Sequence, residues 1–126
     1  IHVHPDMLRF LLAVKGVDRI VLITDVMASR EPNPPSLAHV TDLSYDADGN
    51  LCGSRLTLGM ACRNMRKHTG CSVCDAFVMA SGNPARVAGL YHELGSITVG
   101  KRADLVFVDG EFNVRQVILG GKAVNI

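Results

Sequence analysis

The chain has 126 residues, 48% of them apolar and 5% aromatic, with a formal net charge of +1 at pH 7. This composition predicts a folded globular chain with one core of ordinary size. Because the charge is near neutral and no apolar run is long enough to cross a bilayer, we expect neither nucleic acid nor a membrane as a partner. The sequence opens at Ile1 inside a strand-like run, which indicates a piece of a longer polypeptide.

The first predicted elements are a short extended run, His2-Val3-His4, and a helix that follows it. Pro5 suits the first position of a helix, and Asp6 lies in the first turn, near the positive end of the helix dipole. Apolar residues recur at helical spacing as far as Val14, and Gly16 ends the pattern. With the strand that comes next, this segment predicts a β-α-β unit with a right-handed crossover.

Ile20 to Ile23 are four consecutive large aliphatic residues, three of them β-branched. Such a run is typical of a strand covered on both faces, as in a parallel sheet flanked by helices. Asp25 follows the carboxyl end of this strand, which is where α/β folds place their chemistry. The same residue could equally cap the next turn, and position alone does not choose between the two roles.

The middle of the chain predicts a loop and a hairpin. The segment from Met27 to Ala38 is rich in proline and predicts an irregular loop. Val40 to Tyr45 is weakly strand-like, and the turn residues 46–50 return the chain at Leu51, so we predict a short hairpin. The small residues Cys52 to Ser54 let backbone amides approach a ligand, or simply form a tight entry into the next helix.

Three helices in succession are predicted over residues 57–90, as in the outer layer of an α/β barrel. Thr57 caps the first and Ser72 the second, which Gly82-Asn83-Pro84 breaks before a short third helix over 85–90. After Leu90 the pattern changes to short antiparallel strands and tight turns, beginning with Gly95-Ser96-Ile97 and Gly100-Lys101. We therefore place a domain boundary near residue 92. The second part, 92–126, is too small to be stable alone and should complete a sheet begun elsewhere.

The cysteines are Cys52, Cys62, Cys71 and Cys74, and the last two have the C-x-x-C spacing of redox dithiols and zinc hooks. No second pair stands at a matching spacing, so we favour free cysteines that serve as small apolar residues. Reduced thiols and the lack of a secretion signal predict a cytoplasmic protein.

Several blocks of the sequence together resemble one enzyme family. The blocks are His2-Val3-His4-Pro5, Leu22-Ile23-Thr24-Asp25-Val26-Met27-Ala28, Leu51-Cys52-Gly53-Ser54-Arg55-Leu56-Thr57-Leu58, Asn83-Pro84-Ala85-Arg86, and Leu94-Gly95-Ser96-Ile97 with Gly100-Lys101-Arg102-Ala103-Asp104-Leu105-Val106. In these blocks the chain resembles the C-terminal third of the N-acetylglucosamine-6-phosphate deacetylases, in the amidohydrolase superfamily. The first three blocks together resemble the deacetylases, whereas the last two are similar to the superfamily at large.

The resemblance implies an α/β fold in two parts. Residues 1–91 would be the last part of a (β/α)8 barrel of the TIM type that forms a metal-dependent hydrolase. Residues 92–126 would be the C-terminal strands of a small β-sandwich. The loop over 29–45 is shorter and richer in proline than is usual in the family.

The resemblance also implies roles for five residues. Asp25 would be the catalytic acid/base, and His2 would contact the substrate, whereas His4 lies at a variable position. Leu51, Cys52 and Gly53 would line the sugar site. Cys52 stands where the family commonly has Ala or Ser, so its contact is expected to run through the backbone.

A divalent metal, Zn or Fe, is implied as cofactor, held by a Glu and two His upstream of this chain. His2 and His4 are therefore not assigned as ligands. The metal would activate water and polarise the amide carbonyl, while Asp25 would move a proton to the departing sugar amine. The expected products are glucosamine 6-phosphate and acetate, and we expect a homodimer of the full-length protein.

Two other interpretations stay open. One is a different amidohydrolase, similar to the dihydroorotases or hydantoinases, that shares the barrel but not the substrate. The other is that these residues, when isolated, form a non-catalytic fragment or interaction module, because a barrel of this type needs roughly 200 residues or more.

Overall fold

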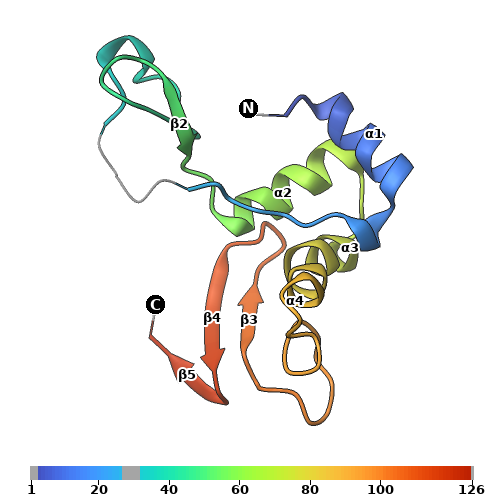
Figure 1. Ribbon diagram of the computed structural model, residues 1–126. Coiled ribbons are helices and arrows are strands. Elements are labelled where there is room, and N and C mark those ends of the chain that lie inside the picture. The colour runs from blue at the N-terminus through green and yellow to red at the C-terminus, as the bar shows by residue number, and fades with distance from the viewer. Residues whose placement is uncertain (1–2, 27–31, 126) are drawn as a thin grey trace.

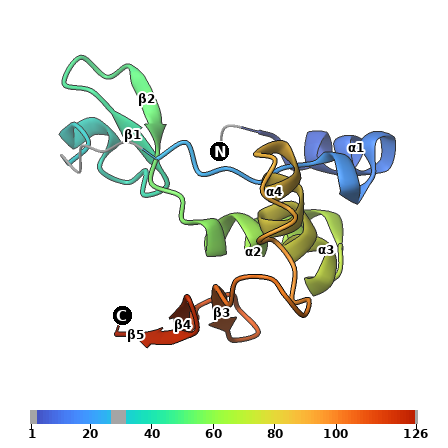
Figure 2. The ribbon, with the colours of Figure 1, turned by 60° about the horizontal axis from the view of Figure 1, so that its bottom comes forward.

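A computed structural model describes residues 3–26 and 32–125 of the chain. A group of helices lies at the centre, a hairpin projects from one end of it, and a three-stranded sheet lies below it (Figures 1 and 2). The α-helices are α1 (Pro5–Lys15), α2 (Leu58–Thr69), α3 (Val73–Phe77) and α4 (Asn83–Val87). Short 3-10 helices form at η1 (Val17–Arg19) and η2 (Pro35–Leu37), and a π-helical turn forms at η3 (Val78–Gly82). Within the described residues, no helix has the length and apolar content of a membrane-spanning segment.

Helix α1 has the bounds that the sequence predicts. Pro5 takes the first helical position, and the Nδ1 atom of His4 accepts a hydrogen bond from the Asp6 backbone N–H at 3.3 Å, so His4 is the N-terminal cap. Gly16 ends the helix with φ 71°, a conformation that glycine adopts without strain. The helix packs against α2.

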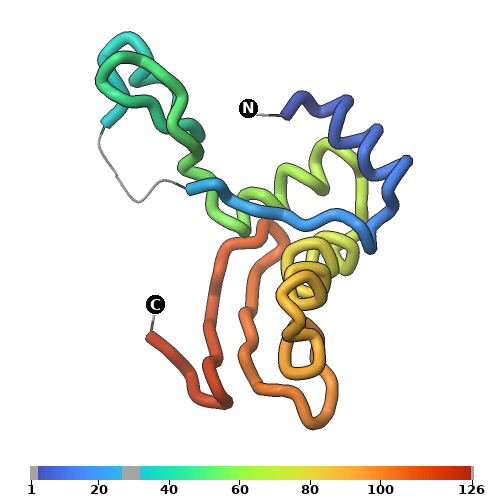
Figure 3. Tube along the Cα trace, in the orientation of Figure 1, coloured from blue at the N-terminus to red at the C-terminus, as the bar shows by residue number. Residues whose placement is uncertain are grey.

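The segment Ile20–Val26 differs from the predicted strand. It crosses from the end of α1 to the hairpin (Figure 3) and forms no strand of its own. Within the described ranges every strand pair is antiparallel, and the single parallel contact is an isolated bridge between Val26 and Ser54. The predicted β-α-β unit and its covered faces are therefore not formed by these residues, and Ile23 is 70% exposed. A parallel ladder needs neighbouring parallel strands, and the described residues supply none.

The predicted hairpin is confirmed. Strand β1 (Leu43–Tyr45) pairs antiparallel with β2 (Leu51–Ser54). The turn between them is held by Asp46, whose Oδ1 accepts hydrogen bonds from the backbone N–H groups of Asp48 and Asn50 at 3.0 and 2.8 Å.

The caps of α2 and α3 are those predicted, but the break after α3 is wrong. Thr57 caps α2, and Ser72 with Asp75 forms a capping box at the start of α3. Past Phe77 the chain stays helical through the π-turn η3 into α4. Gly82 adopts a helical conformation, and Pro84 falls in the first turn of α4, where its missing N–H is not required.

The C-terminal sheet confirms the predicted antiparallel tail. Strands β3 (Leu105–Val108), β4 (Val114–Leu119) and β5 (Lys122–Val124) follow one another in sheet order. The stretch 95–101, predicted as short strands and turns, forms turns and bends but no strand. Its backbone is held instead by Lys101, whose ammonium donates to the carbonyls of Tyr91 and Leu94 and lies 3.7 Å from the Tyr91 ring centroid.

The small buried core joins the helices to the C-terminal sheet. Phe112, in the turn between β3 and β4, is 4% exposed and clusters with Cys62 of α2 and Ala76 of α3. Its ring lies 5.7 Å from that of Phe77. All four cysteines are free thiols in the structure, and Cys62 is 3% exposed, as expected for a cysteine that fills a core. Cys74, by contrast, is exposed.

Replacing Gly59 with alanine tests the contact between α2 and this turn. An added Cβ would lie 2.6 Å from the Phe112 carbonyl oxygen. Alanine favours a helix by about 1 kcal/mol over glycine. Backbone crowding outweighs this gain, and we expect Gly59→Ala to lower the free energy of unfolding by about 1–3 kcal/mol. Gly110→Ala is the matched control, since nothing lies within 4 Å of its added Cβ. Urea unfolding of both variants measures the difference, and equal stabilities would contradict the contact.

The thiol of Cys62 gives a second test. Burial raises its pKa, so less of it is thiolate at pH 8, and its sulfur is also sterically protected. We expect iodoacetamide to leave Cys62 unmodified in the folded protein and to modify it in urea, as followed by peptide mass spectrometry. Modification of Cys62 at equal rates in the two conditions would show that the core does not enclose it.

Candidate active site

Asp25 has a backbone conformation that few residues other than glycine adopt. Its φ is 51°, in the left-handed region, where Asp and Asn are the most tolerated non-glycine residues. This conformation costs of order 1 kcal/mol and persists where surrounding structure imposes it. The residue is exposed, so its carboxylate is open to a ligand.

Ser54 imposes that conformation. Its backbone N–H donates a hydrogen bond to the Asp25 carbonyl oxygen at 2.8 Å, and its hydroxyl donates to the carbonyl oxygen of Thr24. The same hydroxyl accepts a hydrogen bond from the Leu56 N–H at 3.0 Å. Ser54 is 3% exposed, so water does not compete for these bonds. The structure therefore brings the Asp25 block beside the Gly53-Ser54 block, although they are far apart in the sequence.

The three residues predicted to line a sugar site lie on strand β2, whose last residue, Ser54, is hydrogen-bonded to Asp25. Gly53 is buried with φ 145°, a backbone conformation that favours glycine. Leu51 is 51% exposed, and the thiol of Cys52 donates to the Asn50 carbonyl oxygen at 3.3 Å. The predicted substrate contact His2 lies outside the described residues, as does the 27–31 part of the loop that follows Asp25.

Asn83 holds the opposite end of the segment that carries Asp25. Its side chain is 3% exposed, and Nδ2 donates to the carbonyl oxygens of Val17 and Ile20 at 2.8 and 2.7 Å. Arg86 donates to its Oδ1 at 2.8 Å. Two residues into the segment, the Leu22 N–H donates to the Met79 carbonyl at 3.0 Å. In the sequence Asn83 belongs to a predicted helix break and to a block similar to the amidohydrolases, and neither signal indicates a buried backbone anchor.

A second buried asparagine organises the loop beside the hairpin. Asn33 is 8% exposed, and its Nδ2 donates to the carbonyl oxygens of Val40 and Leu43 at 2.8 and 3.0 Å. Its Oδ1 accepts from the Tyr45 N–H and from the Arg55 guanidinium at 3.2 and 3.0 Å. Every polar atom of the amide is thus used, which fixes this part of the loop. An asparagine set among prolines was the available signal for it in the sequence.

The described residues do not form a metal centre by themselves. In the ranges 3–26 and 32–125, no three His, Cys, Asp or Glu side chains come close enough to hold an ion. Cys71 and Cys74 therefore have no companion ligands there. Asp25 can supply one carboxylate, but it belongs to no such group of three in this part of the chain.

Comparison with known proteins identifies the chain's relatives. Residues 8–124 match the amidohydrolase family. The chain is 34% identical to the N-acetylglucosamine-6-phosphate deacetylase of Bacillus subtilis strain 168, over 96% of this chain and 32% of that protein. It is 37% identical to the N-acetylgalactosamine-6-phosphate deacetylase of Escherichia coli O157:H7, over 96% of this chain and 34% of that protein.

The fold agrees with the sequence comparison. The crystal structure of N-acetylglucosamine-6-phosphate deacetylase from Thermotoga maritima superimposes with a TM-score of 0.82 and 32% identity, covering 98% of this chain and 36% of that one. The chain thus spans about a third of the length of these relatives. Since the family match extends over nearly all of the sequence, the chain belongs to the amidohydrolase family.

Proposed function

We propose that the protein is a metal-dependent hydrolase that deacetylates N-acetylglucosamine 6-phosphate to glucosamine 6-phosphate and acetate. The observation that carries the proposal is the placement of Asp25, exposed and in a left-handed conformation that the buried Ser54 imposes. Relatives at 34% and 32% identity that carry the deacetylase name support the choice of substrate. On this proposal residues 1–91 complete a (β/α)8 barrel and residues 92–126 contribute strands to a small β-sandwich.

Asp25 acts as acid and base in this proposal. Its carboxylate takes a proton from the attacking water and then delivers it to the amine that leaves with the sugar. A fixed backbone matters here, because an acid/base must stay within hydrogen-bond reach of both atoms. The bonds of Thr24 and Asp25 with Ser54 supply that restraint without using the carboxylate itself.

The sugar is bound by β2 and by His2. Leu51, Cys52 and Gly53 lie on strand β2, whose last residue, Ser54, is hydrogen-bonded to Asp25, and this supports their assignment to the sugar site. Gly53 is buried, and its positive φ of 145°, which favours glycine, shapes the strand that carries these residues. His2 is proposed to orient the acyl group.

A divalent metal, zinc or iron, completes the proposed site. In this family it polarises the amide carbonyl and makes water more acidic. The ligands that the resemblance to the deacetylases implies, a Glu and two His, are proposed to lie outside this chain, in the rest of the full-length protein. We also propose that the enzyme is cytoplasmic and that the full-length protein forms a homodimer.

A direct assay tests the proposed substrate. We expect the full-length protein, supplied with zinc or iron, to release acetate from N-acetylglucosamine 6-phosphate and to lose this activity on treatment with a chelator. N-Acetylgalactosamine 6-phosphate, a hydantoin and dihydroorotate are run in parallel. Turnover of either ring substrate with none of the acetylated sugars would replace this proposal with a different amidohydrolase. Exclusive turnover of the galactosamine compound would move the proposal to that epimer.

Asp25→Asn tests the role of the carboxylate. Asparagine tolerates the left-handed conformation and the bond from Ser54 reaches a backbone oxygen, so the fold should persist. Turnover should fall by about 10²–10⁴-fold, the usual value of a general acid/base. Asp48→Asn, in the exposed hairpin turn, is the control and should keep full activity. Circular dichroism checks the fold, and an active Asp25→Asn enzyme would remove Asp25 from the mechanism.

A further inference from the structure

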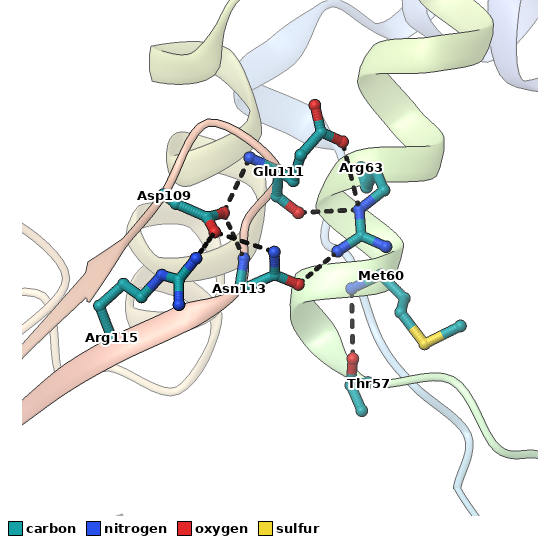
Figure 4. Close-up of polar contacts among 7 residues, drawn as sticks. All are labelled: Thr57, Met60, Arg63, Asp109, Glu111, Asn113 and Arg115. Atoms are coloured by element: carbon teal, nitrogen blue, oxygen red, sulfur yellow. Dashed lines mark hydrogen bonds and ion pairs between the residues drawn. The ribbon is translucent and has the colours of Figure 1, made fainter.

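The turn between β3 and β4 is organised by one carboxylate. Oδ1 of Asp109 accepts hydrogen bonds from the backbone N–H groups of Glu111 and Asn113, both at 2.9 Å. Its Oδ2 accepts from the Asn113 side chain at 2.9 Å and from Arg115 at 2.6 Å (Figure 4). Hydrogen bonds from the Asn113 side chain and backbone, with those from Glu111 and Arg115, hold the pKa of Asp109 well below its usual range. The carboxylate therefore stays ionised, and the turn keeps its shape, at any ordinary pH.

Arg63 of helix α2 binds this turn through two separate groups. Its Nε donates to the Glu111 carbonyl oxygen at 2.8 Å, and its terminal nitrogen donates to Asn113 Oδ1 at 2.9 Å (Figure 4). The Glu111 carboxylate lies 3.8 Å away and adds an ion pair at the surface. A planar guanidinium that donates to two acceptors fixes direction as well as distance.

The turn also touches the start of α2. Phe112 has φ 59° and is buried, and its carbonyl oxygen faces Gly59 so closely that no side chain fits between them. Gly59 is the second residue of α2, and Thr57 caps that helix through the N–H of Met60 at 3.2 Å. The turn thus restrains α2 at its first turn, with Arg63 one turn further along.

The start of α2 is separated from the candidate active site by only three residues, Arg55 to Thr57. Ser54 precedes them, and its N–H holds the carbonyl of Asp25. We propose that the Asp109–Asn113 turn and Arg63 form a latch that sets the position of Ser54, and through it of Asp25, from the C-terminal sheet. Arg63 is then a positioning residue, distant from the reaction. The expected effect of the latch on catalysis rests on the proposed function, whereas its effect on the position of Ser54 does not.

Arg63→Met in the full-length protein tests the latch, because methionine keeps an apolar stem and donates no hydrogen bond. Amide hydrogen exchange is the first readout, and it needs no enzymatic activity. We expect the Ser54 amide to exchange about tenfold faster, with the Leu22 amide unchanged, since the Met79 bond of Leu22 lies outside the latch. Lys67→Met, an exposed charge on the same helix, should change neither amide. Unchanged exchange at Ser54 in Arg63→Met would overturn the latch.

Steady-state kinetics with N-acetylglucosamine 6-phosphate is the second readout. Displacement of Asp25 should lower kcat by about tenfold while KM stays within twofold, because small misplacements affect the transition state more than ground-state binding. Arg63→Lys, which keeps the charge and can bond the Glu111 carbonyl, should recover part of kcat, and it replaces Arg63→Met if that variant does not fold. A lower melting temperature with unchanged kcat and exchange would make Arg63 merely structural. A wild-type protein without deacetylase activity overturns the proposed function, and the exchange result still decides the latch.

Discussion

The position of Asp25 depends on a set of backbone hydrogen bonds at the two ends of one extended segment. Asn83 and the Met79 carbonyl hold its beginning, and Ser54 holds its end. Between these points the segment forms no ladder, so these bonds set its course. Both anchoring side chains are 3% exposed, and a buried amide or hydroxyl that lost its partner would carry a desolvation penalty. The segment is thus fixed by a few protected contacts rather than by a sheet.

The contact between the C-terminal sheet and the helices also depends on a few residues. A single aromatic side chain, Phe112, enters the core beside Cys62 and Ala76. Two residues of α2 complete the contact. Arg63 donates hydrogen bonds to the turn, and Gly59 has no side chain that would clash with the Phe112 carbonyl oxygen. Because α2 starts shortly after Ser54, the sheet and the candidate site are connected by a short covalent path. This connection gives the C-terminal strands a role beyond covering apolar surface.

Elements with strong local signals could be predicted from the sequence. The caps at Thr57 and Ser72, the stop at Gly16 and the hairpin turn at Asp46 are all decided by contacts within a few residues. The strand predicted at Ile20 to Ile23 is different, because an apolar run indicates burial but does not identify the neighbouring elements that would bury it. The sequence predicted a helix break at Gly82-Asn83-Pro84. In the structure the π-turn η3 leads directly into α4, so that Pro84 falls in the first turn of a helix, where it is tolerated. Local sequence does not predict this π-turn.

The candidate site was only partly predictable. Asp25 and Gly53 were found by resemblance and position, and the structure places their blocks side by side. The sequence did not predict the anchoring roles of Ser54, Asn83 and Asn33. A serine or asparagine that bonds distant backbone groups has the same local sequence as one in an ordinary loop. Long-range polar contacts of this kind depend on the folded chain and leave no local pattern.

The proposed mechanism requires the side chain of Asp25 to reach the scissile amide. A crystal structure of the full-length Asp25→Asn variant with N-acetylglucosamine 6-phosphate measures this directly. We predict that the side chain at position 25 lies about 3 Å from the amide nitrogen or from the water that attacks the carbonyl, with the Ser54 bond intact. A substrate bound elsewhere, or a side chain at position 25 turned away from it, would contradict the account.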